Sequence, residues 1–185
     1  MSAGLALLLL LTLPAVEAAP STGTIQVAVL LADFNDATYD SDHDNDWFEA
    51  LAFGSSDSMA DYYDENSRGN LTLEGDVFGP YTLDGDAADW GDEDTDFVKD
   101  TIEAADDDVD FRDYDAVMAV HPGPGEESSG NGDDIWSIHW SGQSISTNDG
   151  NHRIREVTQV PEFEYSGGER RPLGVWCHEF GHELG

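Results

Sequence analysis

The stretch GVWCHEFGHELG, residues 174–185, carries two histidines and a glutamate at a spacing that can serve metal chemistry. His178 and His182 are four residues apart, so on a helix both imidazoles project from one face and can reach the same ion. Glu179 follows the first histidine directly, where it can hold a metal-bound water without being a ligand itself. This H-E-x-x-H pattern is typical of zinc peptidases, in which the two histidines bind zinc and the glutamate is the general base.

The residues around the motif support this interpretation. Leu173, Val175 and Trp176 give the predicted helix a buried back face and leave the histidine face open. Gly185 follows His182 by three residues, where a glycine lets the backbone turn so that a third ligand folds back onto the metal. A catalytic zinc needs three protein ligands and one open position. We therefore expect the third ligand about three residues beyond Gly185, and the chain to be a fragment that lacks the C-terminal half of its domain.

The charge balance excludes some partners. The chain has 40 acidic and 7 basic residues and a net charge of -33, so nucleic acid and anionic lipid are poor partners. Apolar and aromatic residues are too plentiful for a disordered chain. The acidic residues are spread over every segment, which favours a salt-adapted, halophilic surface over a calcium-buffering protein.

The N-terminus resembles a secretory signal. An apolar run from Leu5 to Leu13 is too short to cross a bilayer and precedes a small-residue cleavage site after Ala18. Residues 1–18 are thus a predicted signal peptide, and the protein is expected to be secreted, without membrane insertion after cleavage. No lysine or arginine precedes the apolar run, so the true start is expected upstream.

The remaining residues, 24–185, are predicted to form one catalytic domain. Residues 24–34 and 114–120 are apolar, β-rich runs that predict buried strands, and residues 70–79 alternate as a strand. Helices are predicted around 47–53, 58–66 and 94–108, and the last helix begins near residue 172. Residues 133–142 and 153–163 flank a turn-rich stretch that predicts a reversal. The irregular alternation of strands and helices predicts an α+β domain with a mixed, twisted sheet.

Four other features could carry chemistry. Residues 40–46, DSDHDND, place carboxylates at alternate positions but lack the glycine and glutamate of an EF-hand, so a solvated acidic loop is favoured over an irregular calcium site. His121 is interpreted as structural rather than cleft-lining, and His139 as a packing or hydrogen-bonding residue rather than a ligand. Cys177, the only cysteine, can form no intramolecular disulfide and is expected to be a small buried hydrophobe.

Several of these stretches together resemble the M6 family of zinc metallopeptidases, the immune inhibitor A group. Residues 53–83 are similar to that family's helix with paired tyrosines and the strand that follows. Residues 114–140 resemble its glycine-rich loop and its Ile-Trp-Ser motif, and residues 173–185 match its active-site helix.

The resemblance implies a zincin-like, metzincin-type fold, zinc dependence, structural calcium, and an exported endopeptidase that acts on proteins or peptides. It assigns His178 and His182 as zinc ligands and Glu179 as the general base. Family members continue past the glycine into a segment with the third ligand and usually carry a propeptide, neither of which is found between residues 1 and 185. Two alternatives remain: a truncated pseudopeptidase without catalytic zinc, and an acidic calcium-binding surface protein.

Overall fold

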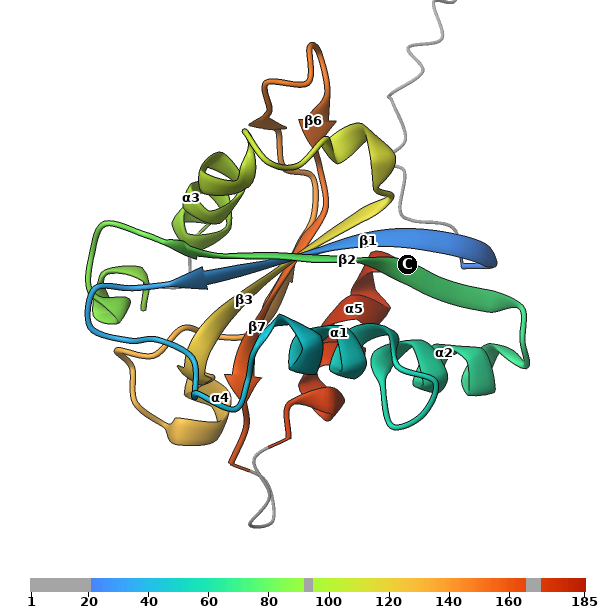
Figure 1. The fold of residues 1–185 in the computed structure, drawn as a ribbon, viewed down its shortest axis with the longest axis horizontal. Helices are drawn as coiled ribbons and strands as arrows, with labels where there is room; N and C mark the ends of the chain where they lie inside the picture. Colours follow the sequence, from blue (N-terminus) through green and yellow to red (C-terminus); the bar gives the residue numbers. More distant parts are fainter. Residues whose placement is uncertain (1–20, 92–94, 166–170) are drawn as a thin grey trace, which may run out of the picture.

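The chain folds around a five-stranded sheet in the order β2-β1-β3-β7-β4 (Figure 1). The structure is a computed structural model that describes residues 21–91, 95–165 and 171–185, so the predicted signal peptide lies outside the described residues. Strands β1 (Gly23–Asp33), β2 (Leu71–Thr82), β3 (Ala116–Pro124) and β7 (Val157–Phe163) pair in parallel. The edge strand β4 (Ile138–Trp140) pairs antiparallel with β7. The prediction of a mixed sheet is confirmed.

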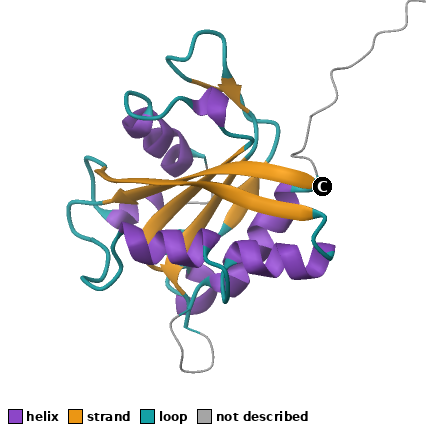
Figure 2. Ribbon diagram, turned by 45° about the vertical axis from the view of Figure 1, so that its right-hand side comes forward, coloured by secondary structure: helices purple, strands orange, loops and turns teal. Residues whose placement is uncertain are grey.

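Helices cover both faces of the sheet (Figure 2). Helices α1 (Asn45–Phe53) and α2 (Met59–Ser67) connect β1 to β2, and α3 (Asp96–Ala105) precedes β3. The last helix, α5 (Leu173–Glu183), lies with α1 and α2 on one face, and α3 lies on the other. Parallel neighbours need such crossover connections. The architecture is therefore a mixed α/β arrangement with a mostly parallel sheet, more regular than the α+β alternation expected from the sequence.

The buried strand β1 explains how the two layers are held together. Its successive side chains point to opposite faces, so Val27 and Val29 contact the α1, α2 and α5 layer while Ala28 and Leu30 contact the α3 layer. A parallel strand covered on both sides reads as a continuous apolar run. This is why residues 24–34 could be identified as a strand from the sequence.

Side-chain caps set the ends of the first two helices. Asp44 accepts a hydrogen bond from the Trp47 amide at 3.0 Å, so α1 begins two residues earlier than predicted. Ser58 accepts in the same way from the Asp61 amide at 3.0 Å. Arg68 ends α2 in the left-handed region with φ 60°. The two helices predicted around residues 47–53 and 58–66 are confirmed.

The smaller elements complete the fold. They are two 3-10 turns (Ala87–Trp90 and Phe111–Asp113), the short helix α4 (Glu126–Ser129), and strands β5 (Ile145–Ser146) and β6 (Arg153–Ile154), which pair with each other. The β5–β6 pair confirms the predicted reversal. None of the described helices combines the length and the apolar character that a membrane span requires.

Candidate active site

Helix α5 is anchored to the sheet by its apolar side. Trp176 is fully buried, and its indole Nε1 donates a hydrogen bond to the Pro161 carbonyl oxygen of β7 at 2.9 Å. Its ring lies parallel to that of Phe48 in α1, with centroids 6.3 Å apart. Phe180 is also fully buried, one turn further along the helix. These contacts fix which face of α5 points away from the core.

Helix α2 supports the same helix from the side. The Tyr63 hydroxyl donates to the Cys177 carbonyl oxygen at 2.6 Å. Gly181 leaves room for this approach, since a Cβ at that position would lie 3.3 Å from the Tyr63 hydroxyl oxygen, a tight contact. The Cys177 side chain is buried, and burial raises the pKa of its thiol to about 12. The prediction that Cys177 is a small buried hydrophobe is confirmed.

The opposite face of α5 carries the H-E-x-x-H residues. His178 and His182 are exposed, and their rings lie edge to face with centroids 5.2 Å apart. Glu179 Oε1 lies 3.8 Å from His178 Nε2, and the Glu179 side chain is only 12% exposed while that of His178 is 69% exposed. One face of the helix thus presents two imidazoles to solvent beside a largely covered carboxylate.

The environment of Glu179 favours its protonated form. Burial raises the pKa of this carboxyl, while positive charge on His178 and His182 lowers it. The backbone N–H of His139 donates to the carboxylate and also lowers the pKa, whereas the nearby charge of Glu127 raises it. A carboxyl with a raised pKa, half-enclosed beside two imidazoles, has the properties of a general base or acid.

His139 on the edge strand β4 lies next to this face. Its ring stacks on that of His182 at a centroid distance of 6.3 Å, and its Nε2 lies 3.0 Å from Glu156 Oε2. Its Nδ1 lies 3.2 Å from the Thr158 hydroxyl. The interpretation of His139 as a hydrogen-bonding residue is confirmed, but the sequence did not place it against His182. The sequence feature that could have placed His139 there is the reversal between residues 133–142 and 153–163. This reversal brings β4 to the exposed edge of β7 and so towards α5.

Glu183 was missed by the sequence reasoning. Its side chain is 1% exposed, and its Oε2, which has no hydrogen-bond partner among the described residues, lies 3.5 Å from His139 Nδ1. Burial, and secondarily the charge of Glu156, raises its pKa to about 8. Its burial could have been predicted from helical spacing, because Glu183 lies three residues after the buried Phe180, on the apolar side of the helix.

A second polar cluster joins the acidic loop, which the sequence had offered as an irregular cation site, to Glu162 at the end of β7, which the sequence had not indicated. Asp40, His43 and Glu162 place their ligand atoms within 4.8 Å of one another. Among the residues that the structure describes, no other set of three metal-binding side chains brings its ligand atoms this close together. The cluster includes neither His178 nor His182. The loop was predicted to be solvated, and Asp40 and Asp42 are indeed exposed, but His43 is half-buried.

His121 takes the structural role expected of it. Its side chain is 2% exposed and packs against Phe97 of α3, with ring centroids 5.8 Å apart. Its Nδ1 lies 3.0 Å from the Pro122 carbonyl oxygen. Burial lowers its pKa to about 4, so the imidazole is neutral. It lies on the α3 face of the sheet, opposite the face that α5 covers.

Comparison with known proteins finds two similarities, and one of them includes helix α5. Residues 108–185 match the family model described as "Immune inhibitor A peptidase M6, catalytic domain", which includes β3, β7 and α5. Immune inhibitor A from Bacillus thuringiensis subsp. alesti is 30% identical over 195 residues, an alignment that includes 83% of this chain. The chain spans 28% of the length of that relative. With an H-E-x-x-H helix in the matched region, the chain belongs to the M6, immune inhibitor A family of metallopeptidases.

Proposed function

We propose that this protein is a secreted, zinc-dependent endopeptidase that hydrolyses peptide bonds in proteins or peptides. The observation that carries the proposal is the exposed face of α5, where two imidazoles and the largely covered Glu179 carboxylate stand together. Membership of the M6 family supports it. The sheet with one antiparallel edge strand beside that helix supports a zincin-like, metzincin-type fold.

The residues on α5 fit a zinc ion by their chemistry. Neutral imidazole nitrogens are preferred zinc ligands, and both histidines are exposed to the solvent from which an ion and a substrate would arrive. His178 and His182 would hold the ion. Zinc bound there supplies a Lewis acid, which polarises a carbonyl group and lowers the pKa of water to about 7.

Glu179 would move the proton in this reaction. Its carboxylate accepts a proton from the attacking water and returns it to the amine that leaves. The raised pKa of Glu179 favours the second step, because a carboxyl that holds its proton more firmly can deliver it as a general acid. The His139 backbone N–H, which donates to this carboxylate, keeps it oriented towards the histidine face.

The experiment is to compare the full-length protein with its Glu179→Ala variant for hydrolysis of a mixed peptide library in molar salt. Peptide hydrolysis is expected to fall by a factor of about 1,000 or more, while bound zinc, measured by elemental analysis, is unchanged. The matched control is Glu103→Ala, which removes an exposed carboxylate from α3 and should leave hydrolysis unchanged. Retained proteolysis in Glu179→Ala would overturn the proposal, and an inactive wild type that binds no zinc would favour a pseudopeptidase.

A further inference from the structure

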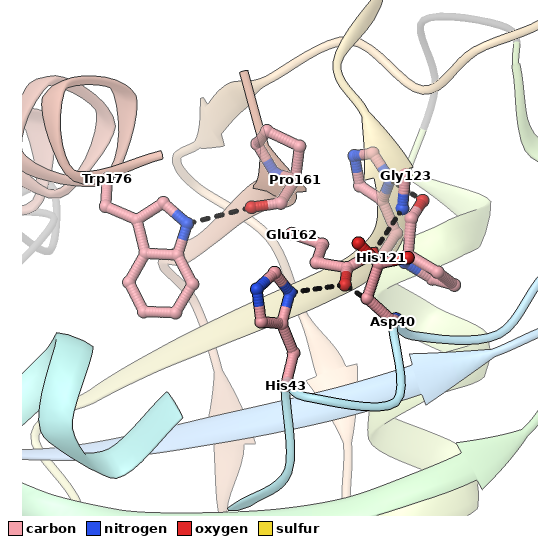
Figure 3. A network of polar contacts seen from close by, with 8 residues as sticks. Asp40, His43, His121, Gly123, Pro161, Glu162 and Trp176 are labelled. Carbon is pink, nitrogen blue, oxygen red and sulfur yellow. Dashed lines mark hydrogen bonds and ion pairs between the residues drawn. The ribbon is translucent and has the colours of Figure 1, made fainter. Parts of the chain in front are cut away.

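The carboxylate of Glu162, at the end of β7, is the centre of the second polar cluster (Figure 3). Its Oε1 accepts a hydrogen bond from the Asp40 amide at 2.8 Å and lies 2.6 Å from His43 Nδ1. Its Oε2 accepts from the Gly123 amide at 2.9 Å. The Glu162 side chain is 1% exposed. Three segments that are distant in the sequence therefore meet on one buried carboxylate.

The buried carboxylate of Glu162 is paired with a histidine rather than with a lysine or arginine among the described residues. The carboxylates of Asp40 and Glu162 lie within 4.8 Å of each other, in a chain whose net charge is already -33. Within the described ranges, no lysine or arginine forms an ion pair with Glu162, and its one ionisable partner is His43. Buried carboxylates are normally paired with a cation or bound to a metal, because removing an isolated charge from water is costly.

We propose that Asp40, His43 and Glu162 form a binding site for a divalent transition-metal ion of the zinc or manganese type, separate from the H-E-x-x-H helix. One imidazole nitrogen and two carboxylate oxygens suit such an ion, whereas calcium takes oxygen ligands alone. Two ligand atoms that are each about 2.1 Å from an ion lie at most about 4.2 Å apart. The three side chains therefore need to close by less than about 1 Å.

Without the ion, a proton links His43 to Glu162, which explains their short contact of 2.6 Å. A metal ligand must be deprotonated, so the ion replaces this proton between the same two atoms. His43 is already held in place, because its ring stacks on that of Trp47 with centroids 3.8 Å apart. The rotamer of the proposed ligand is thus fixed before an ion arrives.

His43 can be reached by solvent from the side of α1, whereas the Glu162 side chain is buried. His43 and Trp47 line a cavity of about 360 Å³, together with Asp57 and Arg171. Asp40 is exposed, so an ion can enter without unfolding the loop, and water can fill the coordination positions that the protein leaves open.

Binding of the ion would stabilise the fold around the ends of β3 and β7. The ion would tie the loop between β1 and α1 to the ends of β3 and β7, where Glu162 and Gly123 already meet. Pro161, the residue before Glu162, accepts the hydrogen bond of Trp176. An ion on Glu162 therefore stabilises the part of β7 on which α5 rests.

To test the proposal, metal is removed from the full-length protein with a chelator, and the protein is dialysed against zinc or manganese. The number of metal ions bound per chain is then measured. The starting point is the His178→Ala/His182→Ala double variant, so that ions on α5 do not contribute. Adding His43→Ala, or separately Asp40→Asn, is expected to lower the count by one ion per chain. The ion should also raise the Tm of the double variant and leave that of the His43→Ala triple variant unchanged.

The control is Asp42→Asn in the double variant, which removes an exposed carboxylate from the same loop and should retain the ion. Because Asp40 is exposed, Asp40→Asn keeps the fold testable even where His43→Ala does not. Equal metal counts with and without His43 and Asp40 would overturn the proposal. So would a site that retains calcium but neither zinc nor manganese, since that pattern requires ligands that are all oxygen.

Discussion

The imidazole rings of His139 and His182 are stacked, with centroids 6.3 Å apart and planes inclined by 25°. One ring belongs to the edge strand β4 and the other to the helix α5. Behind them, the carboxylates of Glu156 and Glu183 lie on either side of the His139 ring, at 3.0 and 3.5 Å from its two nitrogens. The imidazole thus lies between two carboxylates, and burial, with a smaller contribution from the charge of Glu156, raises the pKa of Glu183.

This position makes His139 important for stability. We expect His139→Ala to lower the free energy of unfolding by about 1–3 kcal/mol, because Glu156 Oε2 loses its donor and a buried acceptor left without a donor costs about 1–3 kcal/mol. Urea unfolding at pH 7 measures this change. The control is His152→Ala in the β5–β6 hairpin, which is half-buried and should change the free energy by less than about 0.5 kcal/mol. Equal effects of the two substitutions would show that the contacts of His139 contribute little.

Features that depend on neighbouring residues in the sequence could be predicted. The apolar run of β1 and the helices near residues 47–53 and 58–66 were identified from local patterns, although the cap Asp44, which sets the first residue of α1, was not. The exposure of His178 and His182 on one face of α5 follows from their spacing and from the buried Trp176 and Phe180.

Features that depend on strand pairing could not be predicted. His43 and Glu162 are 119 residues apart, and they meet because β7 pairs with β3 and the loop after β1 returns over the ends of both strands. The three-residue strand β4 is too short to show a period of two, so the place of His139 depended on its register with β7. The parallel order of the sheet likewise arises from crossovers that no local pattern specifies.

Adjacent tyrosines on α2 provide a matched pair of substitutions. Tyr63 is 8% exposed and its hydroxyl donates to the Cys177 carbonyl oxygen, whereas Tyr62 is 46% exposed. Tyr63→Phe is expected to destabilise the fold by about 1 kcal/mol, which lowers the Tm by about 2–4 °C in a domain of this size. Tyr62→Phe should leave the Tm unchanged. A differential scanning calorimetry comparison in which both variants melt with the wild type would contradict the proposed support of α5 by α2.

The net charge of -33 predicts that salt stabilises the fold. Screening shortens the Debye length from about 10 Å at 0.1 M to about 3 Å at 1 M, which weakens repulsion among surface carboxylates. We therefore expect the Tm to rise over this range of NaCl concentration. A variant that carries Asp42→Asn, Asp46→Asn and Asp107→Asn, all at exposed positions, should show a smaller rise. A Tm that does not depend on salt in either protein would contradict a salt-adapted surface.

The buried His121 predicts how stability changes in mild acid. Burial lowers its pKa from 6.5 to about 4 in the folded protein, against the opposing charges of Glu127 and Asp134. Above pH 6.5 the imidazole is neutral in both states, and its contribution to stability is fully present. As the pH falls from 6.5 towards 4, the unfolded chain takes up a proton that the folded chain does not, so the free energy of unfolding decreases.

The loss assigned to His121 is at most about 3 kcal/mol, because one pKa unit corresponds to about 1.4 kcal/mol. His121→Gln has no titrating group at this position, so its stability should fall less steeply between pH 6.5 and pH 4. Urea unfolding of both proteins at fixed salt across that range measures the difference between the two curves. If the curves run parallel, His121 is protonated in the folded state, and its burial against Phe97 does not keep it neutral.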